Sequence, residues 1–329
     1  MIDERGTDET QTPPCSAPVP YFRQSYFREY GVPLILLTVS LVTTTAIGAR
    51  FMQNFTDGLP AIASDGDLWP WPWLIARPER FLLGWPFSLS LLAILLAHEF
   101  GHYIACRHHG IHATLPWVLP APSLSGTAGA VIQIRSAIPN RQALMDVGVY
   151  GPIAGYLASL PVLTLGLMLS RSPAGPPKPS LIEFGKPLTL DLLHGILGRF
   201  HSGAPAFDQA LRHPVLIAGW IGLFVTALNL IPGGQLDGGH ILYALSPQVH
   251  RWTTRLLPLA LLACGLFFWI GWLLWGLILL IPAMRHPRVP IEGPLHRGQL
   301  LLSLVALLLF FLTCSIEPFK GSSLLHYFF

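Results

Sequence analysis

Long apolar intervals without a charged residue are the strongest pattern in this chain. Six intervals between consecutive Asp, Glu, Lys or Arg residues are long and apolar enough for a membrane-spanning helix, which needs about 20 such residues. They cover residues 30–49, 81–98, 147–170, 213–236, 256–284 and 298–316. The pattern predicts an all-α polytopic membrane protein with about six transmembrane helices.

A seventh uncharged interval, residues 108–134, differs from the other six. It contains residues that disfavour a continuous helix, namely Pro116, Pro120, Pro122, Gly126 and Gly129. Its last part, residues 128–134, has the β-branched pattern of a short strand. We expect a membrane-associated β-hairpin or loop between the second and third helices.

The polar segments indicate the domain organisation. Residues 1–29 are acidic and contain several prolines, among them Pro13, Pro14 and Pro18, which predicts a flexible N-terminal tail, too acidic for a transit peptide. Residues 171–212 form a polar loop with a short amphipathic piece near residues 188–200. We expect one transmembrane domain over residues 30–320, with its core at about residues 81–250.

Composition narrows the class further. Charged residues make up 11% of the 329 residues, against about 25% in soluble domains, and 52% are hydrophobic. These values exclude a soluble enzyme and a disordered chain, and a net charge of +3 without a basic patch argues against nucleic-acid binding. Four cysteines without a Cys-x-x-Cys pair predict buried thiols, at Cys15, Cys106, Cys264 and Cys314.

The second span ends in a cluster of ionisable residues, which are expensive inside a membrane and therefore point to function. It reads His98-Glu99-Phe-Gly-His102, a His-Glu-x-x-His pattern on a helix. Two histidines four residues apart share one helix face and can bind one Zn²⁺, and Glu99 beside them can act as general base. The alternative is that these side chains only form hydrogen bonds between helices.

A hydrolytic zinc site needs a third protein ligand. His108 has the spacing of a longer zinc motif, but Ala105 replaces its turn-forming glycine and a continuing helix would carry His108 away. The nearest downstream glutamate is Glu183, in a proline-rich loop. His108 and its neighbours His109 and His112 fit an interfacial position better.

Asp237 is the better third candidate. It follows the fourth span, in a stretch where Pro232 and two glycine pairs break the helix. Irregular backbone at membrane depth is tolerated only against protein or a wet cavity. Spans two and four run in the same direction, so their C-terminal ends reach the same side. His240 nearby could support the site or be merely polar, and both interpretations remain open.

With these two motifs the chain resembles the site-2 protease family of intramembrane zinc metalloproteases. The resemblance rests on His98-Glu99-Phe-Gly-His102 and on Asn229-Leu-Ile-Pro followed by Leu-Asp237-Gly, and it covers about residues 80–245. It implies one Zn²⁺ held by His98, His102 and Asp237, with Glu99 as general base and acid. It also implies that Asn229 contacts the substrate backbone or the developing oxyanion.

The chain departs from the family pattern at one position, because Gly234 stands where some members have a second proline. No stretch is long enough for the PDZ-like domain that many members insert, so we expect a PDZ-less branch. The resemblance also implies an active site towards the cytosol and a transmembrane protein as substrate. A bacterial inner membrane is the expected location, with an organelle membrane as the alternative.

Two further features concern packing and substrate. Gly151 and Gly155 in the third span form a small-x-x-x-small ridge for close helix packing. The strand at residues 128–134 could pair with an unwound substrate, which the family resemblance also suggests.

The rival functions are a metal-binding transporter, an inactive homologue, and a different membrane protease that uses a glutamate as its third ligand.

Overall fold

The computed structural model of this chain is a bundle of helices with two small sheets, and it describes residues 26–173, 175, 178–200, 205–291 and 293–328. Residues 1–25, which hold most of the predicted tail and Cys15, lie outside the described residues. The helices are α1 (Val32–Thr56), α2 (Trp71–Ala76), α3 (Trp85–His108), α4 (Arg141–Leu169), α5 (Leu188–Leu197), α6 (Pro214–Asn229), α7 (Asp237–Leu245), α8 (Pro247–Phe267), α9 (Gly271–Leu280), α10 (Arg297–Thr313) and α11 (Leu324–Phe328). The strands are β1 (Trp117–Pro120), β2 (Thr127–Val131), β3 (Glu183–Phe184) and β4 (Phe319–Lys320).

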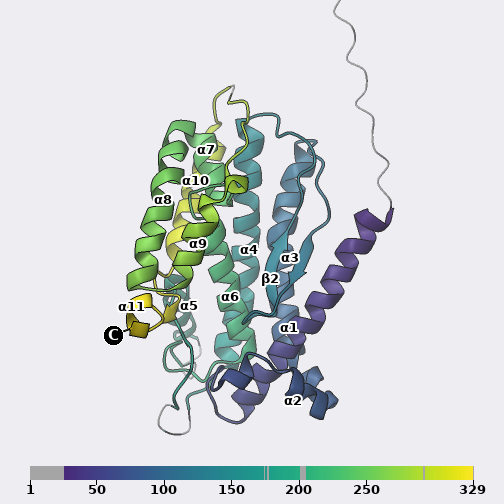
Figure 1. Cartoon of the computed structure of the whole chain (residues 1–329), viewed down its shortest axis with the longest axis vertical. Helices are drawn as coiled ribbons and strands as arrows, with labels where there is room; N and C mark the ends of the chain where they lie inside the picture. The colour runs from purple at the N-terminus through teal and green to yellow at the C-terminus, as the bar shows by residue number, and fades with distance from the viewer. Residues whose placement is uncertain (1–25, 174, 176–177, 201–204, 292, 329) are drawn as a thin grey trace, which may run out of the picture.

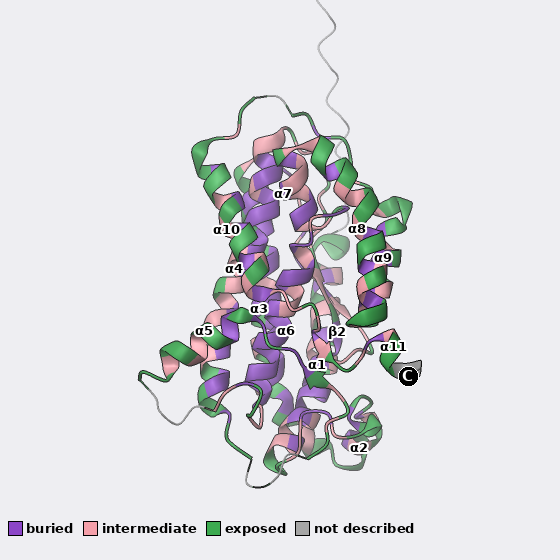
Figure 2. Cartoon of the chain, turned by 90° about the vertical axis from the view of Figure 1, so that its left-hand side faces the viewer, coloured by how far each residue is buried: buried purple, intermediate pink, exposed green. Residues whose placement is uncertain are grey.

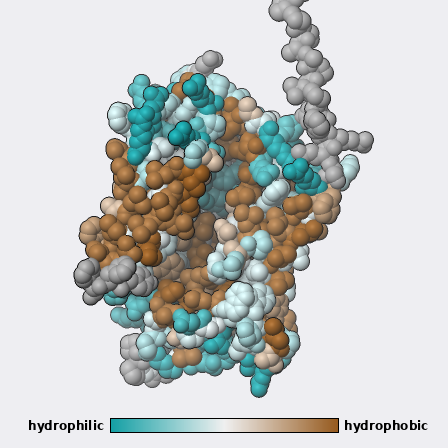
Figure 3. Space-filling model, in the orientation of Figure 1, coloured by the Kyte–Doolittle hydropathy of each residue, from teal (hydrophilic) through white to brown (hydrophobic). Residues whose placement is uncertain are grey.

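Among the described residues, three helical stretches are long and apolar enough to cross a membrane. They are Phe27–Thr56, Pro78–His108 and Arg141–Leu169, and they contain the first, second and most of the third predicted span. Among the other apolar helices, α6, α9 and α10 are shorter. Apolar side chains gather across the middle of one face and hydrophilic ones at its two ends, with a hollow between the apolar areas (Figure 3). The mostly helical, membrane-type class is therefore confirmed, whereas full-length spans are found for three of the predicted six.

The fifth predicted span, residues 256–284, is wrong as a single helix. The chain instead forms α8 and α9, which pack against each other in opposite directions (Figure 1). A Cβ on Gly276 would lie 3.0 Å from the Pro258 carbonyl oxygen, and one on Gly265 would lie 2.5 Å from Leu273. An unbroken helix of this length would measure about 43 Å, more than the roughly 30 Å hydrocarbon core.

The fourth predicted span also ends early. Helix α6 stops at Asn229, and residues 230–236 form the turns that the prolines and glycines there predict. A Cβ on Gly238 would lie 2.1 Å from the Leu230 carbonyl oxygen, so α7 can start close against the end of α6 only because this residue is glycine. The irregular segment thus turns the chain back and presents Asp237 at the first position of α7.

The core lies between α3, α4 and α6, whose facing sides are buried along most of their length (Figure 2). Leu91, Leu163 and Trp220 from these three helices are 0–1% exposed. Cys106 at the end of α3 is fully buried as predicted, whereas Cys264 and Cys314 are only partly buried. Apolar contact along three helices stabilises the bundle and fixes how far each helix is rotated.

The predicted hairpin is confirmed. Strands β1 and β2 pair antiparallel, with Trp117 opposite Val131. Helix α1 lies along this hairpin, and it donates hydrogen bonds from Ser40 Oγ to the Val118 carbonyl (3.0 Å) and from Thr43 Oγ1 to the Gly126 carbonyl (2.6 Å). Strand β1 contacts α1 and pairs with β2. The other edge of β2, which is not paired with β1, faces α3.

The long polar connection contains the expected amphipathic helix, α5, and the short strand β3. Strand β3 pairs with β4 near the C-terminus, with Glu183 opposite Lys320. Residues 174, 176–177 and 201–204 of this connection lie outside the described residues. This region closes the end of the bundle opposite α7 (Figure 1).

Candidate metal centre

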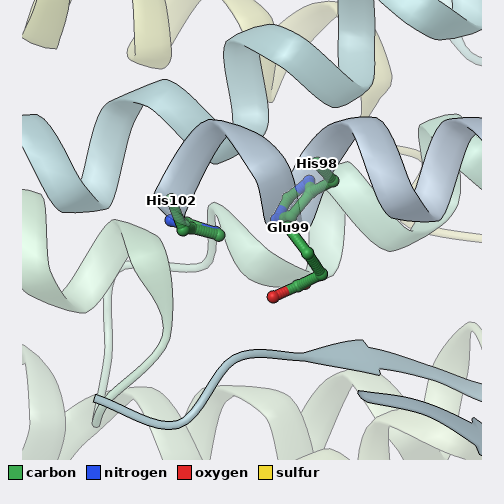
Figure 4. Close-up of side chains that lie close together, drawn as sticks. All are labelled: His98, Glu99 and His102. Carbon is green, nitrogen blue, oxygen red and sulfur yellow. The ribbon is translucent and has the colours of Figure 1, made fainter. Parts of the chain in front are cut away.

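His98 and His102 lie one turn apart on α3 and share one face of it (Figure 4). Their ring centroids are 4.9 Å apart, and the residues are only 3% and 6% exposed. Glu99 belongs to the same turn and extends towards the β1–β2 hairpin (Figure 4). One ligand atom from each of these three residues lies within 4.8 Å of the others, close enough to surround one metal ion.

Asp237 joins this group from α7. Its Oδ2 lies 3.2 Å from His98 Nε2 and 3.3 Å from His102 Nε2, although 139 residues separate Asp237 from His98. The two predicted motifs therefore meet in space, at the C-terminal part of α3 and the beginning of α7. Two imidazoles and a carboxylate that converge in this way are a donor set suited to Zn²⁺.

The hydrogen bond behind His102 shows why a cation fits this group. His102 Nδ1 lies 2.7 Å from the Val147 carbonyl oxygen, which can only accept, so Nδ1 carries the proton. A neutral His102 then has a lone pair on Nε2, which faces the lone pairs of Asp237 Oδ2. Two acceptors at this distance need a proton or a metal ion between them. A backbone carbonyl behind a metal-binding histidine is also the usual way to orient its ring.

The glycines of α4 form the surface on which both rings lie. A Cβ at Gly151 would be 2.1 Å from His102 Nε2, and a Cβ at Gly155 would be 2.8 Å from His98 Nδ1. The sequence predicted a helix-packing ridge here, and the ridge does pack against α3. Its consequence for the imidazoles could not be read from the spacing, because it depends on how far α3 is rotated.

Asn229 lies at the end of α6, with its amide Nδ2 3.2 Å from His98 Nε2. The same ring nitrogen is 3.2 Å from Asp237 Oδ2. A protonated Nε2 could donate to the carboxylate but not accept from the amide, and a deprotonated one could only accept. The two contacts therefore need different protonation states of His98 Nε2, and Asn229 lies beside this ring nitrogen at the cavity.

These side chains line one cavity of about 710 Å³. On one side are His98, Glu99, His102, Val147, Asp237 and His240, which come from α3, α4 and α7 and which we call the helical wall. On the other side are Ala130–Ile132, Ile134, Ser136–Pro139 and residues 287–290, which we call the loop wall. The backbone amide of Ile132, just after β2, faces the Glu99 carboxylate. The proposed base therefore extends from the helical wall to the loop wall.

The sequence interpretation missed the second half of the loop wall, residues 287–290, which follow α9. Gln235 holds the preceding backbone by donating to the carbonyls of Ala283 (2.6 Å) and Arg285 (2.9 Å). His286 lies 2.8 Å from the His240 ring and stacks on Tyr243 with the ring centroids 4.1 Å apart. Three prolines in residues 282–290 were the signal of an ordered extended segment.

The other third-ligand candidates lie elsewhere. His108 is exposed at the last position of α3, and His109 pairs with Asp146 at 2.7 Å instead of facing the site. Glu183 lines a different cavity together with Asp57, near the C-terminal end of α1. Among the residues that the structure describes, Asp237 is the candidate that reaches both histidines.

The comparisons of this chain with known proteins agree on one protein family. Residues 86–267, more than half of the chain, match the model of peptidase family M50. A rice (Oryza sativa subsp. japonica) protein named probable zinc metalloprotease EGY1, chloroplastic, is 36% identical over 208 residues, which are 62% of this chain and 35% of that protein. The Arabidopsis thaliana protein of the same name is 30% identical over 277 residues, 80% of this chain and 48% of that protein. The chain thus spans about a third to half of the length of these relatives.

Proposed function

This chain belongs to peptidase family M50, the site-2 protease family, and from that membership we propose that it is an intramembrane zinc metalloendopeptidase. Its substrates would be membrane proteins, cleaved in or near a transmembrane segment. The observation that carries the proposal is the meeting of Asp237 with His98 and His102, at 3.2 and 3.3 Å, beside the carboxylate of Glu99.

We assign one zinc ion per chain to His98, His102 and Asp237. When bound there, zinc supplies Lewis-acid chemistry: it makes a water more acidic and polarises a carbonyl group. The Val147 carbonyl supports this assignment, because it fixes the tautomer in which His102 offers Nε2. The glycine face of α4 supports it too, because it leaves room for both rings.

Glu99 is the proposed general base and acid. It takes a proton from the attacking water and then delivers it to the leaving amine, so both transfers use one carboxylate at the junction of the two walls. Asn229 would bind the substrate backbone or the developing oxyanion through its amide N–H. Its position beside His98, on the cavity, is consistent with that role.

The membrane arrangement is also a proposal. Helix α6, the antiparallel pair α8–α9 and α10 would lie in the membrane around α1, α3 and α4, within one domain at residues 30–320. We place the active site towards the cytosolic side in a bacterial membrane, or the equivalent side of an organelle membrane. The relatives are named chloroplastic, so the bacterial location gains no support from them.

The test combines metal content with cleavage, using purified protein in detergent. We expect one zinc per chain in the wild type and its loss in Asp237→Ala. Glu99→Gln should keep the zinc and lose cleavage of a model transmembrane peptide by at least a hundredfold, the scale of a lost general base. Zinc retained in Asp237→Ala would contradict the ligand set. Zinc bound without any Glu99-dependent cleavage would instead favour a binding or transport role.

A further inference from the structure

The charges around the cavity divide unevenly between the two walls. The helical wall carries the proposed zinc ligands, Glu99 and the neighbouring His240. On the loop wall, Arg288 is the one ionisable side chain among the described lining residues. It is a cation that the proposed hydrolysis does not use.

The backbone around Arg288 is held in place. Val289 is 7% exposed and packs into the core cluster that contains Leu144 and Ala306, while Arg288 and Pro290 on either side of it are exposed. In an extended segment neighbouring side chains point in opposite directions, so burying Val289 turns Arg288 away from the core. Pro287 and Pro290 limit the backbone rotation further.

Arg288 also has no ion-pair partner among the described residues. A guanidinium group presents several N–H donors in a fixed plane and binds a carboxylate in a bidentate manner. In a partly enclosed cavity such a pair is screened less than on an open surface. The guanidinium group of Arg288, which is in no ion pair within the described part of the chain, can therefore bind an anionic group that enters the cavity.

We propose that Arg288 is a specificity-determining residue that selects substrate segments carrying an Asp or Glu close to the scissile bond. This rests on the proposed protease function and names its substrate class. A carboxylate on the substrate would pair with Arg288 on the loop wall while the peptide backbone lies across the cavity at Glu99. A lysine at the same substrate position would be rejected by like charge.

The test uses a series of model transmembrane peptides, identical except that one Asp, Asn or Lys is moved through the positions flanking the cleaved bond. For wild-type protein, one position should show kcat/KM roughly tenfold higher for Asp than for Asn, the effect expected of a partly screened ion pair. Arg288→Glu should reverse the preference at that position in favour of Lys. Arg285→Glu makes the same change in charge three residues earlier, outside the cavity lining, and should keep the wild-type preference.

The possible outcomes separate the two proposals. Equal Glu99-dependent cleavage of all peptides by wild type would overturn the role of Arg288 and leave the protease intact. An equal loss for every peptide in Arg288→Glu would also overturn it, and would indicate a structural or lipid-headgroup contact instead. Absence of any Glu99-dependent cleavage would overturn both proposals.

Discussion

The two walls of the cavity are built by different means. On the helical wall, a Cβ added at Gly151 or Gly155 of α4 would clash with the imidazole of His102 or His98, so one added methyl group would displace a proposed ligand. On the loop wall, hydrogen bonds from Gln235 and the His286 ring stack hold an irregular segment in place. Close packing tolerates little displacement, whereas hydrogen-bonded loops can adjust. The helical wall thus suits chemistry, and the loop wall suits selection of substrate.

The largest effect should follow from one methyl group on the helical wall. In Gly151→Ala the new Cβ would lie 2.1 Å from His102 Nε2, so the ring or the helix must move. We expect zinc content to fall by at least tenfold and cleavage to be lost, measured by metal analysis and peptide assay. Gly195→Ala, on α5 with nothing within 4 Å of the new Cβ, is the matched control and should keep both. Full zinc in Gly151→Ala would mean that α4 does not seat the ring.

An intermediate effect should follow at Gly148 on the same helix. There a Cβ would lie 3.1 Å from the Asp237 carbonyl oxygen and from the His240 Cβ, which is tight but allows a small shift of α7. Gly148→Ala should weaken zinc binding by roughly threefold to tenfold, the effect of about 1 kcal/mol of strain. Competition with a chromogenic chelator measures this change. An effect as large as that of Gly151→Ala would show that α7 is as rigidly placed as α3.

On the loop wall, removal of a hydrogen-bond donor should affect substrate use and not the metal. Gln235→Leu removes both bonds to the Ala283 and Arg285 carbonyls, each contributing about 1 kcal/mol. We expect kcat/KM for a transmembrane peptide to fall by roughly fivefold with zinc content unchanged. Gln53→Leu, which removes two exposed hydrogen bonds from α1 to Asp57, should leave kcat/KM as in the wild type. Zinc loss in Gln235→Leu would mean that the two walls are not independent.

The smallest effect concerns pH and the histidine pair that holds the loop wall. Burial lowers the pKa of His240 and of His286 from 6.5 to about 4, so both are neutral at pH 7. If residues 285–291 detach from α7, the two imidazoles regain ordinary pKa values. They then bind more protons than in the packed segment, which we call the closed segment. The stability of the closed segment is therefore complete above pH 6.5 and decreases as pH falls towards 4.

Hydrogen exchange of residues 285–291, corrected for intrinsic rates, measures this effect. Protection should be lower at pH 5 than at pH 7. His286→Phe keeps an aromatic ring to stack on Tyr243 but cannot be protonated, so it should show a smaller pH dependence. An unchanged dependence would assign the effect to other groups near His240, namely His102, Asp237 and His250.

Much of the candidate site could be predicted from residue type and spacing. His98 and His102 are four positions apart, which places them on one helix face in any context. Pro232 and the two glycines that follow it directly favour a helix end, and the direction of spans two and four places Asp237 on the side of the histidines. The hairpin followed from prolines and a β-branched run. These inferences are local, or need only the count of membrane crossings.

Apolarity along the chain determined that this is a helical membrane protein, and two short motifs determined its family and candidate ligands. Tertiary structure decided the rest. It divided residues 256–284 into α8 and α9, turned the glycines of α4 towards the imidazoles, and brought residues 287–290 across the cavity. The physical reason is that these contacts join segments far apart in sequence. They depend on helix rotation and on packing of the whole bundle, which hydropathy and spacing along one helix do not contain.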